Sequence, residues 1–231
     1  MFSPDHSPVL AALSERELER LLRGSVPRTL EPGDILYLAG DDASRLYVVE
    51  SGVLKYTARD GEGAETILGL AVEGDLVGEI AMLDGDLQPL DAVAATECRV
   101  MGLDAAFFLE LLRENPDASL ELATTLAQRN RWLGSAALER TSGEVPQKLA
   151  ARLLDLAELL GRVHGQTIEL DLPLPQKDLG RLAGMCRESA CKTMRRFQAD
   201  GLLDYRGRRL RIHRPDLLHK IRCSGRPGAR V

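Results

Sequence analysis

The sequence predicts an α+β protein in three parts: a β-rich N-terminal domain, one long helix, and a C-terminal domain of short helices with a basic hairpin. Short apolar runs separated by glycine and aspartate turns fill residues 26–103, whereas helical spacing begins at Asp104. The net charge of −5 is also uneven, because residues 175–222 carry thirteen Lys/Arg against five Asp/Glu. An acidic front and a basic back indicate two domains with different partners.

The N-terminal domain, which we place at residues 1–114, begins with a helix and continues as β-structure. Ser14 and Glu17 have the spacing of a capping box, which predicts a helix within residues 9–23. The strands that follow have turn signals about every 8–12 residues, a pattern typical of a closed sandwich or jelly roll. We count residues 76–81 (LVGEIA) among these strands, and expect no helix long enough for a βαβ unit.

Residues 115–141 predict a long helix that supports dimerisation. Asn115, Pro116 and Asp117 supply a cap, a proline at the first position and an acid in the first turn. A helix of about 24 residues is about 36 Å long, more than one small sandwich covers, so a partner helix is expected. The alternative is that this helix packs only against its own domain. We expect an apolar stripe toward the partner, with small residues beside it: Leu122, Leu126, Leu133 and Ala137, then Ala123, Ala127, Asn130 and Gly134.

The C-terminal domain, residues 142–222, combines helices with a hairpin. Helices are predicted over 145–160, 175–183, 187–199 and 215–221, with a tight turn between the second and the third. Residues 167–174 alternate like an edge strand, residues 202–213 predict a hairpin, and residues 223–231 predict a disordered tail. Helix, turn, helix and basic hairpin together predict a winged helix-turn-helix, whose partner is double-stranded DNA.

The second helix of this motif carries side chains suited to the major groove. Arg187 can donate a bidentate pair to guanine, and Glu188 can accept from cytosine. Arginines of the hairpin, or wing, suit phosphate contacts. The alternative for this segment is an exposed helix held by salt bridges. The DNA-contacting residues that we predict are Gln176, Arg187, Glu188, Ser189, Cys191, Lys192, Arg195, Arg206 and Arg208.

Other classes of protein lack support in the sequence. We find no glycine-rich phosphate loop, metal-ligand cluster or nucleophile motif, so we expect no enzyme activity, no metal and no cofactor. Scattered cysteines, no apolar run near the ~20 residues of a membrane span, and no signal-peptide core predict a cytoplasmic protein without a membrane partner. A regulatory module serving an enzyme or channel is a competing interpretation, in which the basic helix has no use.

The motifs in their order resemble those of the CRP/FNR superfamily of bacterial transcription regulators over about residues 12–221. The resemblance lies in LEPGDILYLAGDDASRLYVVESGVLKY, EGDLVGEIAMLDG and ATECRV at the front, and in LPQKDLGRLAGMCRESACKTMRRFQADGLL at the back. It implies a double-stranded β-helix (jelly roll) like a cyclic-nucleotide-binding domain, a homodimer on a palindromic operator, and contact with RNA polymerase. Because Lys192 replaces the second arginine of the family's recognition helix, a TGTGA-like half-site is expected with a relaxed inner G·C preference.

The resemblance also implies an effector site, and here the chain departs from the nucleotide-binding members. Gly78-Glu79 match the pair whose carboxylate takes a ribose hydroxyl, but Gln88-Pro89 replace the Arg-Ser pair that holds the cyclic phosphate. We therefore expect no tight cyclic AMP binding, and either a different small-molecule effector or effector-independent DNA binding. A shifted loop could instead bring Arg99, or Arg129 or Arg131 of the partner subunit, into reach. The candidate pocket residues are Gly78, Glu79, Ile80, Gln88, Pro89 and Leu133.

Two positions next to the recognition helix also depart from the family. Pro175 stands where many members have a threonine or serine that caps the helix and contacts phosphate. Cys186 is at the N-cap of the recognition helix beside Arg187, and both a helix N-terminus and a cation lower the pKa of a thiol. Redox sensing and a weak replacement for a serine cap are the two interpretations. A Cys186–Cys191 disulfide is not expected, because five helical residues separate the Cα atoms by ~8 Å.

Overall fold

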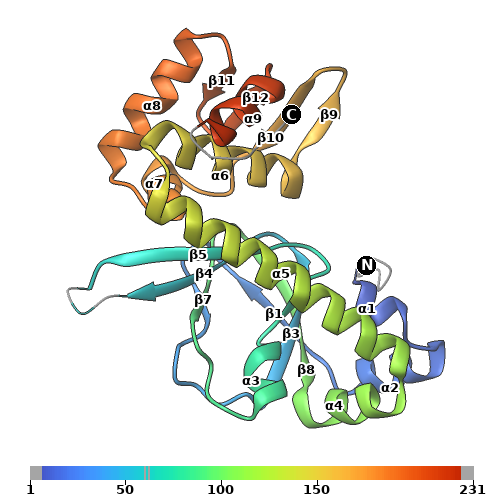
Figure 1. The fold of residues 1–231 in the computed structure, drawn as a ribbon. Helices are drawn as coiled ribbons and strands as arrows, with labels where there is room; N and C mark the ends of the chain where they lie inside the picture. Colours follow the sequence, from blue (N-terminus) through green and yellow to red (C-terminus); the bar gives the residue numbers. More distant parts are fainter. Residues whose placement is uncertain (1–6, 60, 62, 225–231) are drawn as a thin grey trace. The chain divides into compact units, whose positions relative to one another are not determined.

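The computed structural model describes residues 7–59, 61 and 63–224, except for the side chain of Gln176. The chain divides after Trp132 into two compact units (Figure 1). Strands and helices occur in both, so the predicted α+β class is confirmed.

The first unit contains two four-stranded antiparallel sheets, as expected for a jelly roll. One sheet has the order β1-β8-β3-β6 and the other β2-β7-β4-β5. Gly52, in the turn between β3 and β4, has a φ of +88°, and a Cβ there would lie 2.2 Å from the carbonyl oxygen of Glu97. Only glycine fits this turn. The strands are β1 Val26–Leu30, β2 Ile35–Tyr37, β3 Arg45–Ser51, β4 Leu54–Arg59, β5 Glu65–Ala71, β6 Leu76–Val77, β7 Asp91–Ala94 and β8 Cys98–Asp104.

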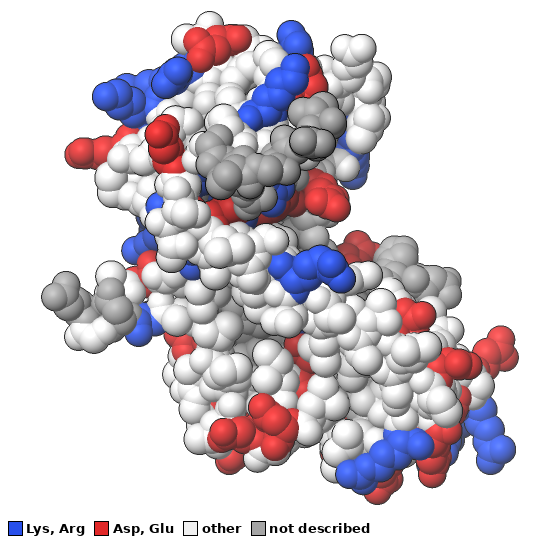
Figure 2. All heavy atoms as spheres, in the orientation of Figure 1, with Lys and Arg blue, Asp and Glu red and all other residues white. Residues whose placement is uncertain are grey.

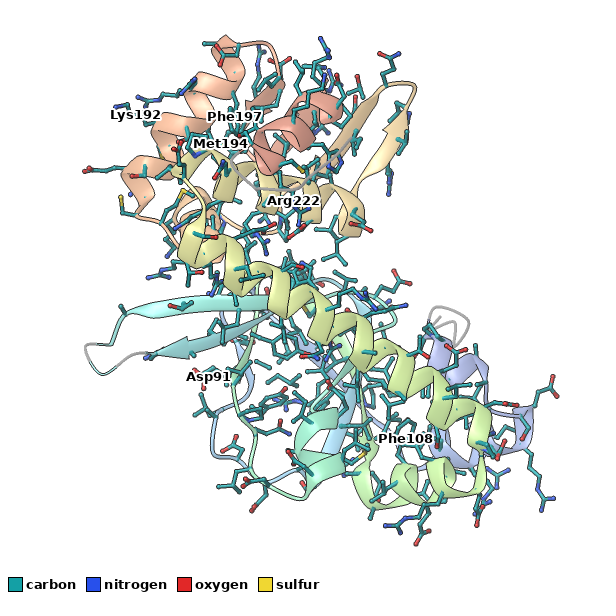
Figure 3. All side chains as sticks on the ribbon, in the orientation of Figure 1. Asp91, Phe108, Lys192, Met194, Phe197 and Arg222 are labelled. Carbon is teal, nitrogen blue, oxygen red and sulfur yellow. The ribbon has the colours of Figure 1, made fainter. Side chains whose placement is uncertain are left out.

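Four short helices complete the described part of this unit. In α2 the predicted capping box is confirmed, because Glu17 N–H donates to Ser14 Oγ and Ser14 N–H donates to the Glu17 carboxylate at 2.8 Å. Phe108 of α4 is fully buried in a core that also contains residues of α1 and α2 (Figure 3). The helices are α1 Pro8–Ala11, α2 Glu15–Arg23, α3 Glu79–Asp84 and α4 Ala105–Glu114.

Helix α3 corrects the expectation that residues 76–81 form one strand. Strand β6 ends at Val77, and Gly78 has a φ of +89°, which turns the chain into a helix that begins at Glu79. Gly85, also left-handed, ends the helix after Asp84. A short apolar run is compatible with a buried strand and with a buried helix, so the pattern of residues 76–81 did not distinguish between them.

The long helix α5, Pro116–Ser142, begins where the sequence predicts, with the Ala118 N–H donating to the Asn115 side chain at 3.0 Å. The expected stripe toward a partner is partly wrong. Leu122 is only 3% exposed and belongs to the core of the first unit, and Leu126 packs against that core. The exposed row is the one with small residues: Leu120, Ala123, Ala127, Asn130, Gly134, Ala137 and Thr141.

The second unit consists of helices around one four-stranded sheet of order β11-β12-β10-β9. The predicted limits of α6 and α8 are confirmed. At the end of α5, the carboxylate of Glu139 is held by Arg152 of α6 and by Arg222 of α9, the latter at 2.9 Å. Its elements are α6 Val145–Leu160, β9 Arg162–His164, β10 Thr167–Asp171, α7 Gln176–Ala183, α8 Arg187–Ala199, β11 Leu203–Arg206, β12 Arg209–Ile212 and α9 Pro215–Cys223.

Two expectations for this unit need correction. Strand β10 is internal, not at an edge, because it pairs with β12 on one side and with β9, which the sequence did not predict, on the other. The last helix continues to Cys223, so the tail begins later than expected. Residues 225–231 of that predicted disordered tail lie outside the described residues.

Candidate DNA interface and effector site

Helices α7 and α8 form the predicted helix-turn-helix. Gly184 ends α7 with a φ of +66°, and the Met185 N–H donates to the Gly180 carbonyl at 2.9 Å, which closes the turn between the helices. One face of α8 is anchored in the core through Ala190, Met194 and Phe197. The helix is therefore held rigidly with its other face outward.

The outward face of α8 carries most of the predicted base-contacting residues. Arg187, Glu188, Lys192 and Arg195 are exposed, whereas Ser189 and Cys191 are half-buried. Lys192 points away from the domain while Met194 and Phe197 point into it (Figure 3). Figure 2 shows basic side chains on the surface over α8. This face combines donors and one acceptor at the spacing that a major groove accommodates.

The arginines of the β11–β12 wing differ in their partners. Arg206 is exposed and forms no ion pair with any described residue. Arg211 pairs with Glu169 at 2.9 Å, and Arg209 lies 3.9 Å from Asp171. Arg208 donates from Nε and Nη2 to the backbone carbonyls of Leu172 and Pro173. Arg206 is thus the wing arginine with the least intramolecular engagement.

The other predicted DNA-facing positions lie at the starts of the two helices. Gln176 opens α7, and its side chain lies outside the described ones. Pro175 makes no side-chain cap bond, as its chemistry requires. Cys186 precedes α8 with its Sγ 3.2 Å from Ser189 Oγ, and hydrogen bonding to Ser189 lowers the pKa of this exposed thiol.

The effector candidates centre on Glu79, whose carboxylate is almost completely buried at the start of α3. It forms an ion pair with Arg129 of α5 in the same chain. Burial raises the pKa of Glu79, and the Arg129 guanidinium opposes that rise. Arg129 also donates to the Leu76 carbonyl at 3.4 Å and lies 5.8 Å from the centre of the Tyr56 ring. One arginine therefore binds a carboxylate and an aromatic face together.

The sequence did not predict this role of Arg129 within one subunit. The signal was present: Ala118, Leu122 and Leu126 face the core of the first unit, and Arg129 is the next residue on that face at helical spacing. The resemblance places the phosphate-binding arginine in the loop around Gln88, where this chain has Gln88-Pro89. The guanidinium at this site belongs instead to Arg129 of the long helix α5.

Of the remaining candidates in the first unit, Gln88 lies beside the Glu79 turn, whereas Ile80 and Pro89 are on the surface. Gln88 is 4% exposed, and its Nε2 is 3.2 Å from where a Cβ on Gly78 would stand. Ile80 and Pro89 are exposed, and Leu133 belongs to the second unit. The buried hydroxyl of Tyr56 has no hydrogen-bond partner among the described residues. Glu79, Gln88, Arg129 and Tyr56 are thus polar groups of this site, and Asp75 and Tyr37 lie close enough to raise the pKa of Arg129.

Metal binding and membrane spanning have no support in the described residues. They contain no group of three or more His, Cys, Asp or Glu that could hold a metal ion. None of their helices is both long and apolar enough to cross a membrane.

Comparison with known proteins gives two family matches. A cyclic nucleotide-binding domain model matches residues 27–115, and a Crp-like helix-turn-helix domain model matches residues 147–221. The chain is 27% identical over 180 residues to a CRP-like cAMP-activated global transcriptional regulator of Mycobacterium tuberculosis, covering 78% of this chain and 80% of that one. It is 25% identical over 217 residues to the fumarate nitrate reduction regulatory protein of Klebsiella oxytoca, covering 93% and 86%.

Solved structures agree with these matches. FixK2 from Bradyrhizobium japonicum has the same fold at a TM-score of 0.78 and 17% identity, over 87% of this chain and 99% of its own. The c-di-GMP responsive global regulator CLP of Xanthomonas campestris reaches a TM-score of 0.71 at 25% identity, over 87% and 99%. With a cyclic nucleotide-binding domain followed by a Crp-like helix-turn-helix, this chain belongs to the CRP/FNR family of DNA-binding transcription regulators and is not an enzyme.

Proposed function

We propose that this regulator binds a palindromic operator in the cytoplasm as a homodimer, inserts α8 of each subunit into a major groove, and acts on RNA polymerase. The observation that carries this proposal is the exposed face of α8, held outward by Ala190, Met194 and Phe197. Arg187 and Glu188 would contact the bases first, since the N-terminus of a recognition helix enters the groove. Lys192 and Arg195 follow on the same face, with Ser189 and Cys191 at its half-buried margin.

The exposed row of α5 supports the dimer. Its residues recur at alternating steps of three and four, and Leu120 at its start is 65% exposed. Ala123, Ala127 and Gly134 are small enough for a second helix to approach closely, and a Cβ on Gly134 would meet nothing within 4 Å. Asn130 within the row would set the register of two helices, as a single polar position does in coiled coils.

The Glu79–Arg129 pair supports control by something other than cyclic AMP. The carboxylate that would accept a ribose hydroxyl already has a charged partner within the chain. Gln88 beside it offers a neutral amide to a cyclic phosphate, and the exposed Pro89 offers no donor. A nucleotide hydroxyl that displaced Arg129 from Glu79 would break a buried ion pair, which is costly. A different small-molecule effector, or DNA binding without one, fits these residues better.

Fluorescence anisotropy at several salt concentrations tests the proposal. The probes are a duplex with two inverted TGTGA half-sites about 34–36 Å apart and a scrambled duplex of equal length. We expect tighter binding to the first duplex and a linear fall of log K with log salt for both. Equal affinity for the two duplexes at every salt concentration would reject this operator.

A further inference from the structure

Arg208, in the turn of the β11–β12 wing, directs its side chain back to the protein. Its Nε donates to the Leu172 carbonyl and its Nη2 to the Pro173 carbonyl, both at 2.9 Å. In the backbone, the Leu172 N–H donates to the Arg208 carbonyl at 2.7 Å. Three hydrogen bonds therefore join one wing residue to two successive residues of the loop between β10 and α7. We call this set of contacts the wing clasp.

The loop that receives these bonds is firmly placed. Leu172 and Leu174 are each 1% exposed, so both side chains are anchored in the core of the second unit. Pro175 follows directly and is the N-cap residue of α7, where the Asp178 N–H donates to its carbonyl. A wing held to this loop is consequently held relative to the first helix of the helix-turn-helix.

The chemistry of the clasp requires arginine. The two acceptors are carbonyl oxygens of adjacent residues, and the planar guanidinium presents two N–H groups in a fixed fork. A lysine ammonium keeps the charge but presents no such fork. The clasp also lies close to the recognition helix: burial and the Cys191 thiol raise the pKa of Tyr205 on β11, and Arg208 lowers it. Tyr205 of the wing thus lies near both Arg208 and Cys191 of α8.

We propose that Arg208 is a positioning residue that fixes the wing against the helix-turn-helix, so that Arg206 meets a DNA phosphate, and that Arg208 is not itself the phosphate contact. This replaces the direct contact expected from the sequence. The inference rests on the proposed function for the role of the wing on DNA, whereas the clasp itself is independent of DNA. The test therefore has two arms.

The first arm measures hydrogen exchange of the full-length protein without DNA. The Leu172 amide reports on the clasp, because it is bonded to the Arg208 carbonyl. Loss of two charge-assisted bonds should accelerate its exchange at least about tenfold in both Arg208→Ala and Arg208→Lys. Arg206→Ala, two residues away on the same turn, is the matched control and leaves the clasp intact. Unchanged exchange of Leu172 in both Arg208 variants overturns the clasp.

The second arm measures the salt slope of binding to the inverted TGTGA duplex and to the scrambled duplex. A lost phosphate contact lowers the slope by about 0.9, so Arg206→Ala should lower it and Arg206→Lys should not. Arg208→Lys and Arg208→Ala should change the salt slope by the same amount. Adding Arg206→Ala to Arg208→Lys should then change the slope little, because the wing no longer reaches DNA. Retention of the wild-type slope by Arg208→Lys, or full additivity in the double variant, overturns the positioning role.

The two arms separate the possible failures. If the wild-type protein prefers neither duplex, the proposed operator fails, while the exchange of Leu172 still decides the clasp. Thermal unfolding of each variant checks that the second unit remains folded. An Arg208→Lys variant that unfolds as the wild type does, yet binds like Arg208→Ala, is the result that supports positioning.

Discussion

Arg129 of α5 and Glu79 of α3 form an ion pair within one chain, although fifty residues separate them. The Glu79 side chain is 3% exposed and that of Arg129 is 23% exposed. This ion pair therefore connects the long helix α5 to the turn that begins α3, and both of its charges belong to the chain itself.

Cyclic AMP should not bind tightly to the purified protein. Its phosphate would compete with Glu79 for Arg129, and Gln88 adds only a neutral donor. Calorimetry of the apo-protein with cyclic AMP is the measurement. Stoichiometric binding in the low micromolar range (about −8 kcal/mol) that also strengthens DNA affinity would refute this expectation. An Arg129→Gln variant then tells whether that arginine holds the phosphate.

Removing one member of the pair should destabilise the first unit. Breaking a buried pair leaves an uncompensated charge and costs about 3–5 kcal/mol, and we expect the lower end because Arg129 is partly exposed. Glu79→Gln and Arg129→Gln should both show this loss in urea unfolding at pH 7. The control is Glu19→Gln, which breaks the exposed pair with Arg23 and should cost no more than about 1 kcal/mol. Equal stability of all three variants would contradict a structural role for the pair.

Arg187→Ala should weaken sequence discrimination and leave general DNA affinity nearly intact. The loss of a bidentate base contact should cost about 1–3 kcal/mol on the inverted TGTGA duplex and little on the scrambled one. Anisotropy titrations of both duplexes measure the difference. Arg113→Ala, an exposed arginine in the last turn of α4, is the control on the other unit. A uniform loss on both duplexes would reassign Arg187 to the phosphate backbone.

Gly134→Glu should shift the protein toward monomers. A Cβ at this position has no atom within 4 Å in the described part of the chain, so the substitution tests the helix partner and not the fold of one subunit. A charge in a close helix–helix contact would be desolvated without a partner, which is unfavourable. Analytical ultracentrifugation at micromolar concentration measures the outcome. A wild-type protein that sediments only as a monomer, with or without DNA, would exclude the proposed dimer.

Cys186 should be deprotonated, and therefore alkylated, at a lower pH than an ordinary thiol. Hydrogen bonding to Ser189 lowers its pKa, so a Ser189→Ala variant should shift the pH midpoint of iodoacetamide labelling upward. Mass spectrometry of the labelled peptide follows the reaction of Cys186 separately from that of Cys223, which is also exposed. Identical midpoints with and without Ser189 would show that this hydrogen bond does not control the thiol.

Much of the fold was predictable because its signals are local. The limits of α8 follow from Cys186 before the helix and Gly201 after it, and the limits of α6 follow from Pro146 and Gly161. The same holds for the outward face of the recognition helix, since Ala190, Met194 and Phe197 recur at helical spacing. A cap or a periodic stripe acts within a few residues, so the sequence alone determined these elements, and with them the DNA-binding motif.

The tertiary structure decided which element each face meets. The sequence shows that α5 has an apolar face, but only the fold places Leu122 in the core and brings Arg129 to Glu79. Only the fold turns Arg208 back to Leu172, and only pairing with β9 makes β10 an internal strand. In each case the two partners lie far apart in the chain, or one of them belongs to β9, a strand that the sequence pattern does not indicate. The spacing of apolar residues specifies which side of a helix or strand is buried. The element that covers that side is determined by how the loops and sheets are arranged in three dimensions.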